Sequence, residues 1–175
     1  QGNLNNAIGL PLTLLQLTEA HTLAVVEMGM NHPGEIDHLG QIAAPDIGMI
    51  INVAPAHLEG LHSIEGVMHA KGELLRHIAP AGRAILNADD EYCRRLAETC
   101  PVETLLFGFG PEAAIRAADL DSGPRGWTFT LQMPSGEIPV KLQVPGKFMV
   151  ANALAAAAAA YCCDVAPETI QAGLE

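Results

Sequence analysis

Short apolar segments alternate with longer, partly polar segments along the first two thirds of the chain. The apolar segments are continuous instead of alternating with polar residues, which is typical of strands covered on both faces. Strands separated by helices of this length predict βαβ units and an α/β fold, with a mostly parallel, doubly wound sheet flanked by helices. The expected strands are 21–27, 47–53, 83–87 and 103–107, and the expected helices are 12–17, 35–43, 63–78 and 91–98.

The pattern changes after Gly108. Three shorter segments, 114–120, 127–133 and 137–144, are separated by turns that contain Gly and Pro, which predicts a small antiparallel β meander attached to the main sheet. We expect a helix over 150–162 and a second helix that starts at Pro167.

Composition limits the classes of partner. The chain has 175 residues, 49% of them hydrophobic, as expected for one globular domain. A net charge of −11 with nine Lys and Arg disfavours nucleic acid and anionic membranes as partners, and the sequence contains no apolar run of membrane length. The four cysteines have neither zinc nor disulfide spacing, which favours a reducing, cytoplasmic setting. Because the chain begins without Met and ends within a predicted helix, we expect it to be a piece of a longer protein.

Polar residues follow the predicted strands. Glu27 ends the first apolar run, His57 follows the second, and Asn87 with Asp89 follows the third. The carboxyl ends of parallel strands meet at one edge of a sheet, where such folds bind ligands, so these side chains should converge. A carboxylate and an imidazole there can hold a divalent cation that is bound mainly through a nucleotide phosphate, and Lys71 on the next helix can face the same edge.

Plainer interpretations remain open for the same residues. His57 can serve as a helix cap, Asn87 and Asp89 can cap the helix that follows them, and Lys71 can be a solvated helix residue. The turn-forming segment QGNLNNAIGLP can either present amides to a ligand or only order the helix after it.

Five segments, in this order and spacing, resemble the central ATPase domain of the Mur ligases: EMGMNHPGEI, NVAPAHLEG, AKGEL, LNADD and GKFMVANALAAAAA. The resemblance implies a P-loop-NTPase-like α/β domain over 1–175. It also implies that the upstream phosphate loop, the UDP-binding domain and the C-terminal domain are missing, and no G-x-x-x-x-G-K-[ST] motif occurs. In the family's fold these parts complete the ATP and substrate sites.

Within this family, GNLNNAIGLPLTL and EMGMNHPGEI are most similar to the members that add D-alanyl-D-alanine to UDP-N-acetylmuramoyl-tripeptide. The implied reaction uses ATP and Mg²⁺, proceeds through an acyl phosphate and forms a peptide bond during synthesis of the peptidoglycan precursor. The implied protein is a cytoplasmic monomer whose partners are small molecules.

The resemblance also implies roles for single residues. Glu27 resembles the glutamate that binds the magnesium between the ATP phosphates, His57 the histidine of a second cation, and Lys71 the lysine that CO2 converts to a carbamate in many Mur ligases. His57 and Lys71 would be catalytic. The implied nucleotide contacts are Asn87, Asp89 and Asn152, and the implied substrate contacts are Asn3, Asn5, Asn6, Asn31 and His32.

One segment departs from the family pattern. Many relatives have a His-Asn pair shortly before the alanine-rich helix, where this chain has Lys147-Phe148-Met149. Three other functions stay open: a sister Mur ligase or a folylpolyglutamate-type ligase, a catalytically inactive fragment that binds nucleotide poorly, and a purely structural α/β module. The structural module is the least favoured because it leaves the polar strand ends unexplained.

Overall fold

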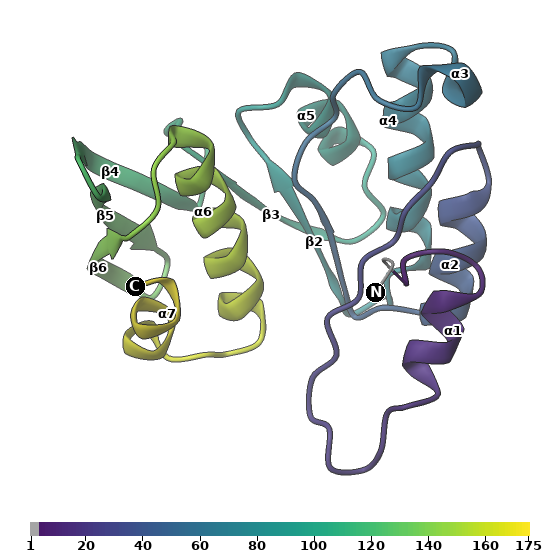
Figure 1. Ribbon diagram of the computed structural model, residues 1–175, viewed down its shortest axis with the longest axis horizontal. Helices are drawn as coiled ribbons and strands as arrows, with labels where there is room; N and C mark the ends of the chain where they lie inside the picture. Colours follow the sequence, from purple (N-terminus) through teal and green to yellow (C-terminus); the bar gives the residue numbers. More distant parts are fainter. Residues whose placement is uncertain (1–3) are drawn as a thin grey trace.

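A computed structural model describes residues 4–175 of the chain, so Asn3, one of the predicted substrate contacts, lies outside the described residues. The structure is a six-stranded sheet with helices on both faces (Figure 1). Neighbouring strands follow the chain order from β1 to β6. The first four strands run parallel and the last three are antiparallel to one another, so the predicted α/β fold is confirmed.

The parallel half of the sheet forms where the continuous apolar runs predicted it. Its elements are β1 (Ile47–Ile50), α3 (Leu58–Leu61), α4 (Ile64–Gly72), the 3-10 helix η1 (Glu73–His77), β2 (Arg83–Asn87), α5 (Glu91–Glu98) and β3 (Glu103–Gly108). Ser63 begins α4, since its hydroxyl accepts a hydrogen bond from the amide of Gly66 at 3.1 Å. In β2, Ala84, Ile85 and Leu86 are fully buried, as expected for a strand covered on both faces.

Helices cover the two faces of the sheet unequally (Figure 1). On one face lie α4 and α5, with α2 (Glu35–Ala43) and α1 (Gly9–Leu14) beside them. On the other face lie α6 (Lys147–Cys162) and α7 (Pro167–Leu174), which follow the meander in the chain. Buried alanines along α6, among them Ala155, Ala157 and Ala158, allow this helix to lie close against the sheet.

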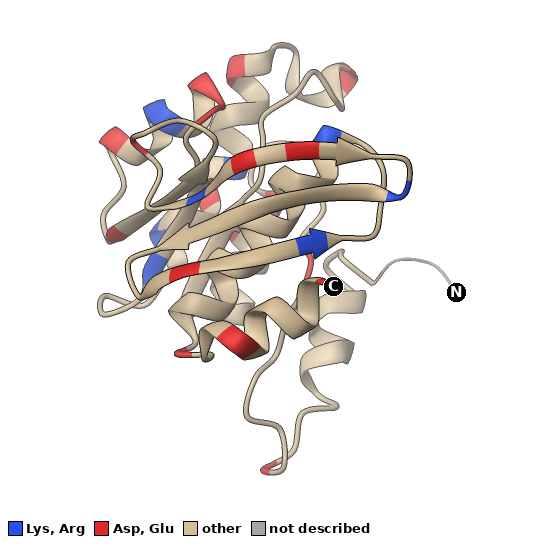
Figure 2. Cartoon of the chain, turned by 90° about the vertical axis from the view of Figure 1, so that its left-hand side faces the viewer, with Lys and Arg blue, Asp and Glu red and all other residues tan. Residues whose placement is uncertain are grey.

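The predicted meander is present as β4 (Ile115–Gly123), β5 (Gly126–Met133) and β6 (Gly136–Leu142). It joins the parallel strands through a short pairing of β4 with β3, in which Phe107 lies opposite Ile115. Figure 2 views the molecule from the side of this meander, where basic residues are interspersed with acidic ones.

The prediction of a strand over 21–27 is wrong. This segment is an irregular loop, and it exposes Leu23 by 63% and Val25 by 96%. An apolar run forms a buried strand only where a neighbouring strand pairs with it, and within residues 4–175 no strand pairs with this one. Glu27 therefore lies within a loop, not at the end of a strand.

In the described part of the chain, no helix is long and apolar enough to cross a membrane.

Candidate active site

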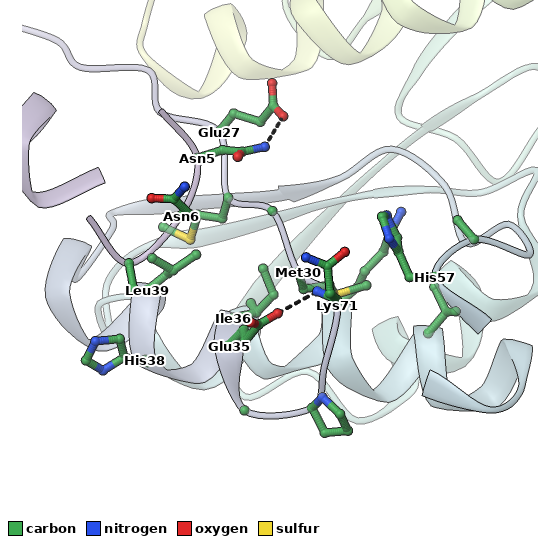
Figure 3. A pocket seen from close by; sticks show the side chains of 18 residues that line it. Asn5, Asn6, Glu27, Met30, Glu35, Ile36, His38, Leu39, His57 and Lys71 are labelled. Carbon is green, nitrogen blue, oxygen red and sulfur yellow. Dashed lines mark hydrogen bonds between the residues drawn. The ribbon is translucent and has the colours of Figure 1, made fainter. Parts of the chain in front are cut away.

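A cleft of about 780 Å³ lies beside the carboxyl end of β1 (Figure 3). The turn at residues 5–7, the loop over 27–31, the start of α2, the residues after β1 and one face of α4 contribute to its walls. Met30, Ile36 and Val67 give it an apolar floor. The cleft brings together six of the residues that the sequence predicts for the site: Asn5, Asn6, Glu27, Asn31, His57 and Lys71.

Asn5 holds Glu27 in this cleft. The Asn5 side-chain amide donates to Glu27 Oε1 at 2.8 Å, and the backbone carbonyl of Asn5 accepts from the amide of Gly29 at 2.8 Å. A Cβ atom at Gly29 would lie 2.7 Å from Asn5 Nδ2, so a larger residue here would displace the Asn5 side chain from its present position. The turn at Asn5 and the loop at residues 27–29 are thereby fixed to each other, and the Glu27 carboxylate is held where they meet.

Asn6 has a structural contact in addition to its place in the cleft. Its Oδ1 accepts from the amides of Ile8 and Gly9, at 3.0 and 2.9 Å, and so orders the first turn of α1. The interpretation of this turn as a segment that orders the following helix is therefore correct for Asn6. It does not conflict with Asn6 also lining the cleft.

His57 lines the cleft from the turn between β1 and α3. Its backbone is left-handed, with φ of 56°, a conformation that non-glycine residues adopt rarely and often near functional sites. The backbone carbonyl of His57, not its imidazole, accepts from the amides of Gly60 and Leu61 in α3. The interpretation of the His57 side chain as a helix cap is thus wrong, and the ring faces the cleft (Figure 3).

Lys71 reaches the end of β1 from α4. Its Nζ donates to the carbonyl oxygen of Asn52 at 2.6 Å, and the N–H of the same peptide group, on Val53, donates to Asp90 Oδ2 at 2.8 Å. Burial lowers the pKa of the Lys71 amine, and the nearby Asp90 and Cys93 only partly offset this effect. One peptide group therefore links the amine to a carboxylate on the segment that follows β2.

The predicted nucleotide contacts lie outside the cleft. The Asn87 amide donates to the carbonyl of Ile51 at 2.9 Å, and Asp89 Oδ2 accepts from the amide of Phe109 at 2.8 Å. Neither residue caps α5, because that cap is Asp90, whose Oδ1 accepts from Cys93 N at 2.9 Å. The capping interpretation of Asn87 and Asp89 is therefore wrong.

Asn152 and His32 are also separate from the cleft. Asn152 lies on the exposed side of α6, where its amide is 3.8 Å from the sulfur of Met149. The Lys147 amine, at the start of the same helix, lies 4.7 Å from the centre of the Phe109 ring, so Phe109 contacts both Asp89 and α6. His32 points toward Glu35, with 3.9 Å between His32 Nδ1 and Glu35 Oε1, and its side chain is mostly exposed.

Three acidic residues that sequence reasoning missed organise the cleft. Glu35 accepts from the amides of Asn31 and His32, which lowers the pKa of its carboxyl group. Asp90 fixes the end of β1, and Glu73 accepts from the start of α2. Of the three, only Glu35 could have been recognised from the nearby sequence, since it lies three and four residues after its partners. The contacts of Glu73 and Asp90 span 36 to 39 residues.

Gly60 offers a test of the cleft wall, because a Cβ atom there would lie 2.0 Å from the carbonyl oxygen of Asn31. We expect Gly60→Ala to displace the loop at Asn31 and to lower the free energy of unfolding by about 1–3 kcal/mol. Gly173→Ala, in α7, is the matched control because nothing lies within 4 Å of its added methyl group. Urea denaturation of both variants measures the difference, and equal stability would contradict the close contact.

A mostly parallel sheet with a polar cleft beside the end of one strand defines an α/β ligand-binding domain. The chain belongs to the Mur ligase family, because the sequence model of the Mur ligase middle domain matches residues 1–160.

Relatives in this family share the fold and much of the sequence. The UDP-N-acetylmuramoyl-tripeptide–D-alanyl-D-alanine ligase of Haemophilus influenzae is 41% identical over 99% of this chain and 38% of its own length. A crystal structure of MurF from Acinetobacter baumannii superposes with a TM-score of 0.94 at 37% identity, over 100% of this chain and 38% of that one. MurF from Thermotoga maritima in complex with ADP gives a TM-score of 0.83 at 27% identity, over 95% and 39%. The chain thus spans well under half the length of the relatives it matches.

Proposed function

We propose that the protein containing this domain is an ATP-dependent ligase that joins D-alanyl-D-alanine to UDP-N-acetylmuramoyl-tripeptide. In this reaction the γ-phosphoryl group of ATP passes to the terminal carboxylate of the tripeptide, and the dipeptide amine then displaces phosphate from the acyl phosphate. The observation that carries the proposal is the presence of Glu27, His57 and Lys71 in one cleft of a Mur ligase domain.

The residues of the cleft fit a divalent cation that is shared with phosphate. Within residues 4–175 no three His, Cys, Asp or Glu side chains gather into a complete metal site. Mg²⁺ is commonly bound by one or two carboxylates together with substrate phosphates, so a single carboxylate suits this role. The Glu27 carboxylate, which the amide of Asn5 orients, would hold the magnesium. His57 would hold a second cation. The bound metals would neutralise charge on the transferring phosphoryl group.

Lys71 is suited to carbamate formation, since CO2 reacts with the neutral amine and burial lowers the pKa of this group. Carbamylation would replace an ammonium that repels a cation with an anionic oxygen ligand. The unmodified amine already contacts the carbonyl of Asn52, on the segment between β1 and His57, so the modified group would be carried by the same wall of the cleft.

The remaining predicted contacts divide between two regions. Asn5, Asn6 and Asn31 line the cleft and would contact the sugar nucleotide and its peptide, with His32 at the outer edge of the same loop. The nucleotide would lie toward Asn87, Asp89 and Asn152, around Phe109. Binding of ADP by the Thermotoga maritima relative supports a nucleotide site in this domain. We further propose that the ligase is a cytoplasmic monomer.

The test is an assay of the full-length protein that contains this domain. With MgATP, UDP-N-acetylmuramoyl-tripeptide and D-alanyl-D-alanine, we expect release of one phosphate per peptide bond formed and a product whose mass equals that of the joined substrates minus water. In parallel assays, single amino acids replace D-alanyl-D-alanine as the amine, and folate substrates replace the tripeptide as the carboxylate. Phosphate release only with those substrates would identify a sister ligase or a folylpolyglutamate-type ligase and contradict the proposal.

A further inference from the structure

Helix α2 forms one wall of the cleft, yet no side chain from its own N-terminal segment caps it. Its N-cap is Gly34, with φ of 85°, and this residue has no side chain to accept a hydrogen bond. The first amides of a helix need acceptors, and leaving them unpaired in a partly buried setting is unfavourable. The acceptors for α2 must therefore come from elsewhere in the fold.

Glu73 supplies them from η1, the element that follows the Lys71-bearing helix α4. Its Oε1 accepts from the amide of Gly34 at 2.8 Å, and its Oε2 accepts from the amide of Asp37 at 3.0 Å. Glu73 is the first residue of η1, directly after α4, and it follows Lys71 by two residues. A negative charge at the N-terminus of a helix also interacts favourably with the helix dipole.

A second set of contacts also joins η1 to the start of α2. Arg76 Nη2 and His77 Nε2, both from η1, lie 3.0 and 2.9 Å from Asp37 Oδ1. The ring of His77 lies against Gly40, where a Cβ atom would come within 2.7 Å of it. The start of α2 and the end of α4 are thus joined by three side chains of η1.

We propose that Glu73 is a positioning residue that fixes the loop and helix over residues 31–38 relative to Lys71. The contacts carry the proposal because six residues on this segment line the cleft, whereas Glu73 lies outside its lining and acts through the amides of the segment. Substrate held by the loop at Asn31 and the amine of Lys71 would keep their relative position only while the Glu73 carboxylate joins the two walls. The catalytic part of this inference rests on the proposed function.

The experiment uses Glu73→Gln in the full-length protein, a change that keeps the shape of the side chain but removes its charge and one acceptor. Hydrogen–deuterium exchange should become about tenfold faster or more at residues 31–38. Exchange in β2 should stay unchanged. Glu65→Gln is the matched control, because Glu65 lies on α4 and, within residues 4–175, its side chain hydrogen-bonds only with the hydroxyl of Tyr92, at 3.4 Å. Unchanged exchange at 31–38, or equally faster exchange in β2, would overturn the proposal.

Kinetics add a readout that separates positioning from general loss of stability. For Glu73→Gln we expect the KM for UDP-N-acetylmuramoyl-tripeptide to rise about fivefold or more, while the KM for MgATP stays within twofold of wild type. An equal rise in both values would contradict the positioning role. If the wild-type protein does not catalyse this reaction, the proposed function fails, but the exchange experiment still decides whether Glu73 holds the segment.

Discussion

Replacing Lys71 with alanine is expected to reduce turnover of the full-length ligase on the order of a hundredfold or more, and His57→Ala should have an effect of similar size. Both side chains line the cleft in which charge on the transferring phosphoryl group would be neutralised. If Lys71 carries a carbamate, alanine removes an anionic ligand from this cleft. The steady-state rate of phosphate release measures the effect.

The stability of Lys71→Ala should change little. The substitution removes the hydrogen bond to Asn52, but it also removes an ammonium whose burial is unfavourable at neutral pH. The pKa of Lys71 is lower in the folded state than in the unfolded state. Below the folded-state pKa the buried ammonium therefore lowers the free energy of unfolding by its full amount, and this loss fades as pH rises toward the ordinary pKa of lysine. In Lys71→Ala this rise of stability with pH should be absent.

Lys141→Ala is the control for this experiment, since Lys141 lies exposed on β6 and does not line the cleft. Bicarbonate labelled with ¹³C should give a carbamate signal with the wild-type protein and with Lys141→Ala, but not with Lys71→Ala. Near-normal turnover of both Lys71→Ala and His57→Ala would remove the two residues from the catalytic site. A carbamate signal that persists in Lys71→Ala would place the modification elsewhere.

Replacing Asp90 with alanine should lower the free energy of unfolding by about 2–4 kcal/mol. The Asp90 carboxylate caps α5 through Cys93 N and also accepts from Val53 N at the end of β1, so one substitution leaves two partly buried amides without their acceptor. Asp121→Ala, on the exposed part of β4, is the control. Urea denaturation gives the difference between the two variants.

The same substitution should also affect Lys71. Asp90 raises the pKa of the lysine amine against the lowering effect of burial, so its removal should lower that pKa further. The pH dependence of carbamate formation reports the change. A stability loss no larger than that of Asp121→Ala, with an unshifted pH dependence, would show that Asp90 neither holds the strand end nor influences the amine.

Sequence reasoning predicted the fold well where local pattern determines structure. The apolar run at 83–87 became β2 with its bounds unchanged, and Pro167 begins α7 because proline suits the first helical position. The run at 21–27 shows the limit of this reasoning, because apolar composition indicates burial but does not supply the partner strand.

The candidate site was predictable in part for a related reason. The ends of strands direct polar residues to one region, so the position of His57 after a strand and of Lys71 on the next helix indicated one shared cleft. Both residues line that cleft, and their catalytic roles stay predictions. Glu73 and Asp90 act through backbone amides that are 36 to 39 residues away, and no local motif indicates such contacts. For Asn87 and Asp89 the plainer alternative of helix capping is wrong, because their side chains bond to loops beside β1 and β3. Their role as nucleotide contacts stays a prediction.

The peptide group between Asn52 and Val53 has a consequence for reading variation among homologues. The acceptor for Lys71 is a main-chain oxygen, which all twenty amino acids carry, so position 52 can diverge freely without losing it. The N–H toward Asp90 is equally generic, with proline at position 53 as the sole exception. Residue identity at these two positions would thus be a poor guide to their importance for the amine.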